Sequence, residues 1–173
     1  MTSIIKVNNI QNSSGTTYNF IKQVLQGTST TESSAITSGN SVDAVSQAIT
    51  PSSTSSKILV RCSVAVGIGD NAYGHGILYR DSTAIGIGTN ATGSQVNASF
   101  MVEGNNYTYG DYRMHTHNFE FLDAPSTTSA ITYKITITSS SDSLYINRPV
   151  VDGGDSAIVV SPMSTITLME VAG

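Results

Sequence analysis

Two histidines spaced two residues apart, His115 and His117, are the side chains best suited to metal chemistry. Side chains two apart on a β-strand point to the same side, so both imidazoles would face one way. Two imidazoles in one chain make a poor metal site. Three copies arranged with this strand near a threefold axis would supply enough of them for an octahedral transition metal. The alternative is a partly buried pair satisfied by hydrogen bonds or interface water. We expect no other cofactor.

Three tyrosines close together, Tyr107, Tyr109 and Tyr112, suggest a surface that recognises another molecule. The segments 104–106 and 110–111 are rich in Gly, Asn and Asp and should break any strand here, which predicts a loop. Exposed tyrosines give contact area at little entropic cost and can stack on sugar rings. The sequence therefore predicts surface recognition, with a host-surface glycan as one partner. The alternative is that these tyrosines pack at a subunit interface.

Enzyme chemistry has little support in the sequence. A nucleophile elbow of the form Gly-x-Ser-x-Gly is absent. Gly-x-Gly occurs within residues 66–74 and again within 85–93, but β-type sequence follows each, whereas a dinucleotide site needs a helix there. A glycosidase requires two apposed carboxylates, and nothing marks such a pair among Glu103, Asp111 and Glu120. We therefore predict that the protein is not an enzyme and has no catalytic residues.

Composition points to a β-rich protein with few charges. Charged residues make up 12 % of the 173 residues, whereas 26 serines and 21 threonines supply the polar surface. Threonine favours strands because its branched Cβ packs well on a pleated surface. The net charge is −4 and the eight Lys and Arg are scattered singly, which argues against nucleic acid as a partner. No stretch is long and apolar enough for membrane insertion.

Alternating apolar and polar residues predict an all-β fold. Residues 131–138 alternate without a fault, and residues 57–66 place apolar side chains on one face. Further strands are expected at 18–25, 76–80, 83–87, 95–102, 114–122, 144–147, 157–160 and 165–171. The strongest helical candidate, residues 43–49, is too short and too rich in serine. Many short strands separated by turn signals predict a jelly-roll-like β-sandwich.

The first part of the chain differs from the rest and is predicted to be an arm. Residues 1–42 contain a polar segment and two apolar patches, too little to form a core. We expect residues 1–42 to attach the protein to a neighbour and residues 43–173 to form the sandwich body. The residues expected to make the attachment are the apolar ones of the two patches, Ile4, Ile5, Val7, Tyr18, Phe20 and Ile21.

Three segments carry a resemblance to a known group of proteins. Residues 4–16 (IIKVNNIQNSSGT), 49–60 (ITPSSTSSKILV) and 164–173 (STITLMEVAG) resemble small structural proteins of tailed bacteriophages, especially marine and cyanobacterial ones. The resemblance covers both ends and the first strand of the body. It implies a virion protein, tail-fibre-like or decoration-like, whose body resembles the trimeric jelly roll of tumour-necrosis-factor-like domains. It brings no catalytic residues.

The resemblance and the residues together give the expected function. We expect a virion protein of the tail-fibre or receptor-binding type, made in the host cytoplasm without a signal peptide, with itself (as a homotrimer) and other virion proteins as partners. One alternative is a decoration protein that stabilises the capsid or tail. Outside the virion, a carbohydrate-binding module or a polysaccharide-degrading enzyme remains open. The homotrimer is also expected because Leu59 and Ala65 lie opposite the apolar face of their strand and need cover.

Overall fold

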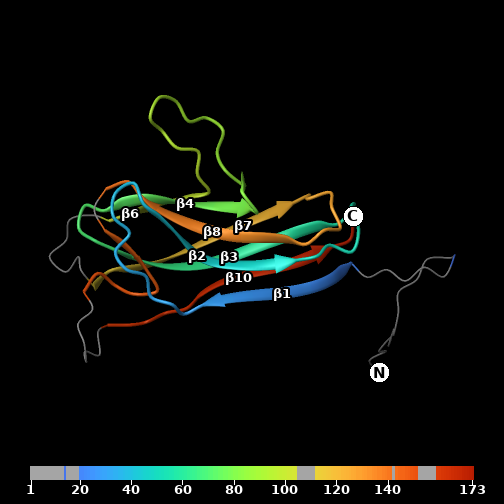
Figure 1. Cartoon of the computed structure of the whole chain (residues 1–173), viewed down its shortest axis with the longest axis horizontal. Helices are drawn as coiled ribbons and strands as arrows, with labels where there is room; N and C mark the ends of the chain where they lie inside the picture. Colours follow the sequence, from blue (N-terminus) through green and yellow to red (C-terminus); the bar gives the residue numbers. More distant parts are fainter. Residues whose placement is uncertain (1–13, 15–19, 105–111, 142, 152–158) are drawn as a thin grey trace, which may run out of the picture.

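The computed structural model describes residues 14, 20–104, 112–141, 143–151 and 159–173. The strands of this part of the chain form two antiparallel sheets that pack face to face (Figure 1). Nowhere in these residues is there a helix with the length and apolar character needed to cross a membrane. The predicted all-β sandwich is confirmed.

Each sheet contains a row of four paired strands and a fifth strand that pairs off this row. The first sheet has the order β1 (Ile21–Ser29), β10 (Ser164–Val171), β3 (Lys57–Ile68) and β7 (Met114–Asp123), and β9 (Leu144–Ile146) also pairs with β3. The second sheet has the order β2 (Ser41–Ile49), β8 (Ile131–Ser139) and β4 (Tyr73–Arg80), and β4 pairs along its other edge with β5 (Thr83–Ile85) and β6 (Phe100–Glu103). The strands β1 to β4 alternate between the two sheets, and β7, β8 and β10 alternate again after β5 and β6, which both stay in the second sheet. This arrangement of two Greek keys is a jelly roll.

The core lies between the inner faces of the two sheets, where the predicted alternation holds. The inward side chains of β3 are buried from Ile58 to Val66, and those of β8 are buried from Ile131 to Ile137. Cys62 belongs to this layer, and burial raises the pKa of its thiol to about 11. The cysteine is therefore a small apolar core residue rather than a nucleophile.

The boundary predicted at residue 42 is wrong. β1 pairs with β10 from Ile21 to Ser29, the Ile36 side chain is buried in the core, and β2 pairs with β8 from Ser41 onward. The body therefore includes residues 20–42. These residues look too polar for a body because β1 is an edge strand, held by backbone hydrogen bonds to β10 as well as by apolar packing. Residues 1–13 and 15–19 lie outside the described residues.

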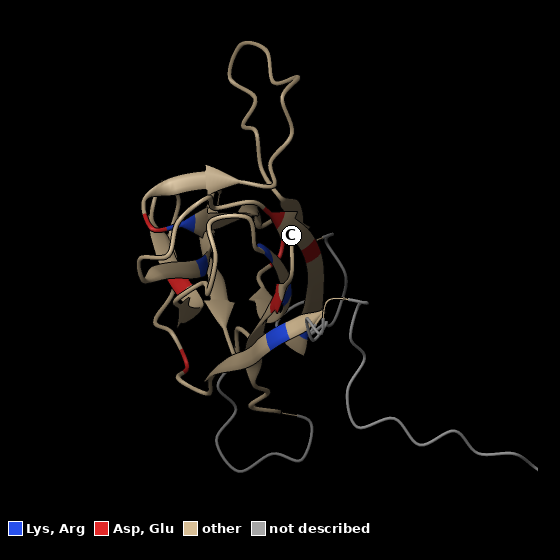
Figure 2. Cartoon of the chain, turned by 90° about the vertical axis from the view of Figure 1, so that its right-hand side faces the viewer, with Lys and Arg blue, Asp and Glu red and all other residues tan. Residues whose placement is uncertain are grey.

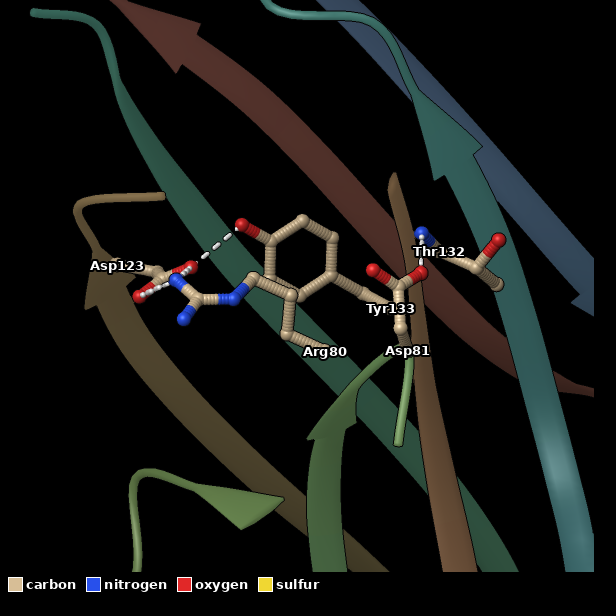
Figure 3. Close-up of polar contacts among 5 residues, drawn as sticks. All are labelled: Arg80, Asp81, Asp123, Thr132 and Tyr133. Atoms are coloured by element: carbon tan, nitrogen blue, oxygen red, sulfur yellow. Dashed lines mark hydrogen bonds and ion pairs between the residues drawn. The ribbon is translucent and has the colours of Figure 1, made fainter. Parts of the chain in front are cut away.

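A buried carboxylate joins the two sheets at one end of the sandwich (Figure 3). Asp123, the last residue of β7, accepts hydrogen bonds from Nη1 of Arg80 at 3.1 and 2.9 Å and from Oη of Tyr133 at 2.6 Å. Arg80 and Tyr133 both belong to the second sheet. Burial first, and the bond to Asp123 next, raise the pKa of Tyr133, so its phenol stays protonated and donates. The cluster fixes the edge of β7 against the opposite sheet.

A second buried carboxylate, Glu170 of β10, gathers the segments around it. Ser52 donates to Oε1 of Glu170 from both its backbone N–H (2.7 Å) and its hydroxyl (2.6 Å). Ser56 adds a third bond at 2.6 Å, and Gln23 of β1 donates to Oε2 at 2.7 Å. Burial alone would raise the pKa of this carboxyl, but the donated hydrogen bonds lower it to about 2. The Glu170 charge therefore holds β1 and the start of β3 in place.

Candidate assembly surface

The outer face of the first sheet carries a row of apolar side chains that crosses all four main strands. The pairing register aligns Val24 of β1 with Met169 of β10, Met169 with Leu59 of β3, and Leu59 with Leu122 of β7. Paired residues share a face, and the neighbours of each in sequence turn inward. Val24 is 52 % exposed and Leu122 is 50 % exposed, while the middle two are half-buried. At the usual strand spacing the row is about 14 Å long. We call these four residues the apolar row.

The apolar surface continues toward the start of β1. Phe20 is 64 % exposed and Ile21 is 53 % exposed, and Val171 beside Ile21 is half-buried. Phe20 and Ile21 are two of the residues predicted to attach the protein to a neighbour, and they lie on the body next to the row. The other four, Ile4, Ile5, Val7 and Tyr18, fall outside the described residues, so their role stays a prediction.

The polar part of the same face borders the row on β3 and β7. Nε of Arg61 forms an ion pair with Oε2 of Glu120 at 2.8 Å, and both side chains are exposed. With Thr165 and Thr167 they line a shallow hollow of about 390 Å³. An exposed ion pair of this kind contributes little to stability. The pair matters here because the charges of Arg61 and Glu120 neutralise each other within one chain.

The chemistry available to this face is binding by apolar contact. Water must order around four adjacent apolar side chains, and covering them releases about 25 cal/mol for each Å² removed from solvent. Contiguous apolar surface on a soluble domain usually marks an interaction site. Leu59 was expected to need cover and belongs to this row. Ala65 is already buried within the chain, where its carbonyl accepts a hydrogen bond from the N–H of Asn147 at 3.0 Å.

The histidine pair lies on the inner side of β7, at the rim of the sandwich. The His115 and His117 rings are 6.2 Å apart, and the His117 ring stacks on Phe100 of the opposite sheet at 5.2 Å. Nε2 of His117 is buried without a hydrogen-bond partner among the described residues. Burial and, less strongly, the neighbouring His115 lower the pKa of His117. Within the described residues no three potential ligands gather. A metal here would therefore need ligands from other copies.

The three tyrosines predicted to form a recognition loop are only partly placed. Tyr112 lies just before β7 and is exposed. Tyr107 and Tyr109 fall outside the described residues, so the structure does not bring the three together. The apolar row was missed as a set because the sequence does not give the register between strands, although the odd placement of Leu59 was a visible signal.

Comparison with known proteins gives matches only among solved structures. No family model and no curated protein matches the chain. The structure of the infectious bursal disease virus Gx strain aligns at 13 % identity with a TM-score of 0.41, over 97 % of this chain and 47 % of that one. The Gt strain of the same virus gives 15 % identity, a TM-score of 0.42 and coverages of 97 % and 43 %. The crystal structure of the VP2 subviral particle of this virus gives 14 % identity and a TM-score of 0.40, over 98 % of this chain and 42 % of that one.

The present chain spans less than half the length of each of these three virus proteins. At these identities and TM-scores the likeness concerns the general architecture alone. The assignment of the fold rests on the strand order of this chain, which by itself is that of a jelly roll. Viral capsid domains share the jelly roll with lectins and cupins, so function has to be argued from the surfaces.

Proposed function

We propose that this protein is a structural subunit of a virus particle, of the tail-fibre or receptor-binding type of tailed bacteriophages. It attaches to other virion proteins through its N-terminal segment and presents a homotrimeric jelly-roll body to the outside. The observation that carries the proposal is the apolar row on the outer face of the first sheet. A free monomer would leave this surface in water, whereas a subunit of an assembly covers it.

A second copy of the chain is the occupant that the face suits best. The row runs from β1 at one edge of the sheet to β7 at the other. Three copies can therefore cover their rows together by turning them toward a common threefold axis. The ion pair beside it is neutral within one chain, so contact between copies leaves neither Arg61 nor Glu120 unpaired. A cyclic trimer also repeats any external binding site, which strengthens adhesion by avidity.

The alternative within the same class is a decoration protein that stabilises a capsid or tail. In that case the apolar row would cover a different virion protein, and the purified chain would stay monomeric until it met that protein. The oligomeric state of the purified chain in solution therefore distinguishes the two roles.

The proposal is tested on virions. Mass spectrometry of particles purified on a density gradient should detect this chain, and an electron-microscopy map should contain a threefold jelly roll of its size. A chain shortened to residues 20–173 should melt at the same temperature as the full chain and fail to join particles, since it keeps every strand of the described residues. Normal incorporation of the shortened chain would contradict attachment through the N-terminal segment. Absence of the chain from purified particles would contradict the function.

A further inference from the structure

A groove lies on the opposite side of the molecule, between the outer face of β4 and β6 and the loop of residues 86–99. Figure 1 shows this loop standing well away from the sheet that it leaves and re-enters. The groove has a volume of about 890 Å³ and is lined by strand residues on one side and loop residues on the other. Sites for small ligands usually have volumes of about 300–1,000 Å³, so the groove is of suitable size.

The loop is held in shape by its own hydrogen bonds. The N–H of Gly88 donates to the carbonyl of Ala98 at 3.2 Å, and the N–H of Ala91 donates to Oδ1 of Asn97 at 3.0 Å. At the tip, the N–H of Thr92 donates to Oε1 of Gln95 at 3.0 Å. The wall of the groove is therefore built before a ligand arrives, which lowers the entropic cost of binding.

The floor of the groove exposes apolar surface. Tyr73 of β4 is 49 % exposed and Met101 of β6 is 60 % exposed, and both lie on the outer face of the sheet with His75 between them. Val96 adds an exposed apolar side chain from the loop. The Tyr73 ring offers a broad apolar surface beside a hydroxyl, the combination that suits the face of a pyranose ring.

The groove is electrically neutral. None of the described residues that line it is Lys, Arg, Asp or Glu, although Glu103, paired with Tyr73, lies just outside the lining. Figure 2 shows the whole projecting loop without a charged residue. Burial lowers the pKa of His75, which keeps its imidazole uncharged near neutral pH. A phosphate, a sialic acid or an acidic peptide would find no opposite charge here, so the ligand should be neutral.

The wall supplies hydrogen-bond donors that the protein does not use itself. Asn97 and Gln95 accept bonds through their side-chain oxygens within the loop. Their amide nitrogens have no partner among the described residues, so both remain available to acceptors of a ligand. A purely apolar ligand would leave these donors unpaired, whereas sugar hydroxyls would satisfy them.

We propose that this groove binds a neutral oligosaccharide, with one sugar ring stacked on Tyr73 and its hydroxyls bonded to Asn97 and Gln95. The inference deepens the adhesive part of the proposed function and rests on that function for the host surface as the source of the glycan. It assigns sugar recognition to Tyr73 in place of Tyr107, Tyr109 and Tyr112. Repetition in a trimer would strengthen a weak single contact by avidity.

The test uses the purified full chain titrated with maltohexaose, cellohexaose and chitohexaose, and with oligosialic acid as the anionic counterpart. Amide chemical shifts should move at residues 73–75 and 88–98 for at least one neutral sugar. Tyr73→Ala should weaken that binding about tenfold, the loss expected for one ring stack. Tyr79→Ala is the matched control, because Tyr79 lies on the same side of β4 outside the groove. The Tyr79→Ala variant should bind the sugar with the same affinity as the unmodified chain.

A second variant keeps the test decisive where Tyr73→Ala alters the fold. Met101→Glu places a charge in the neutral groove at an exposed position and should abolish binding without changing the melting temperature. Binding to none of the neutral sugars, stronger binding to oligosialic acid, or unchanged binding by both groove variants would overturn the inference. A chain that binds sugar but is absent from virions would contradict the proposed function alone, and a virion protein that binds none of these sugars would contradict the groove alone.

Discussion

The two outer faces of the sandwich expose different chemistry although the two inner faces are built alike. The outer face of the first sheet has a continuous apolar row across its four main strands, with an ion pair beside it. The outer face of the second sheet is hollowed by the loop of residues 86–99 into a neutral groove with unused amide donors. An open apolar surface suits another protein surface, and a walled groove suits a small ligand.

One fold can therefore separate assembly from recognition. The inner alternation of β3 and β8 fixes the sandwich, and each outer face is then free to change without disturbing the core.

The largest loss of stability is expected at Asp123, whose hydrogen bonds join the two sheets. Asp123→Ala would leave the Arg80 guanidinium and the Tyr133 hydroxyl without their acceptor in the protein interior (Figure 3). Breaking such a buried pair costs about 3–5 kcal/mol. Urea unfolding measures the loss. Asp43→Ala is the control, since Asp43 forms a more exposed pair with Lys134 and should cost less than about 1 kcal/mol. Equal losses of stability in the two variants would contradict the role given to Asp123.

Acid should loosen β1 of the first sheet before it loosens β8 of the second sheet. The folded pKa of Glu170 is about 2, below its ordinary 4.5, so its charge stabilises the protein above pH 4.5. That stability is lost as the pH falls from 4.5 toward 2. Because Glu170 holds Gln23 and Ser52, hydrogen-exchange protection of β1 should fall in this range before that of β8.

The matching variant for the acid experiment is Glu170→Gln, which cannot ionise. It should be less stable than the unmodified chain at neutral pH, and the contribution of residue 170 to the acid dependence should disappear. If β1 and β8 lost protection together, or if the variant kept the full acid dependence, the role assigned to Glu170 would be wrong.

A smaller change, this time a gain of stability, is expected at His117 on the rim of the sandwich. His117→Phe removes a buried nitrogen that has no partner among the described residues and keeps a ring to stack on Phe100. The substitution should stabilise the protein by about 1 kcal/mol, measured by urea unfolding. If the pair instead holds a metal between copies, elemental analysis should find about one transition-metal atom per trimer and the substitution should destabilise.

The inner structure could be predicted from the sequence better than the outer faces. The periodic strands β3 and β8 were predicted with the correct inward residues, because alternation reports directly which side is buried. β2 was missed, since a bulge between Asp43 and Val45 buries Ala44 and Val45 in succession and breaks the alternation.

The two surfaces depend on partners far apart in the sequence. The apolar row joins residues from Val24 to Met169 through strand register, and the groove joins Tyr73 to Asn97 through the shape of a loop. Neither register nor loop shape follows from local composition, so the sequence pointed instead to the tyrosines around Tyr112. A local cluster is visible in a sequence, whereas a surface assembled from several strands is not.

The most direct test of the assembly surface is sedimentation of the purified chain beside the double variant Val24→Asp and Leu122→Asp. Both positions are exposed, so the free energy of unfolding of one subunit should change by no more than about 0.5 kcal/mol. We predict a trimer for the unmodified chain at micromolar concentration and a folded monomer for the variant. A monomer for both, or an unchanged trimer in the variant, would contradict the claim that the apolar row joins copies of this protein.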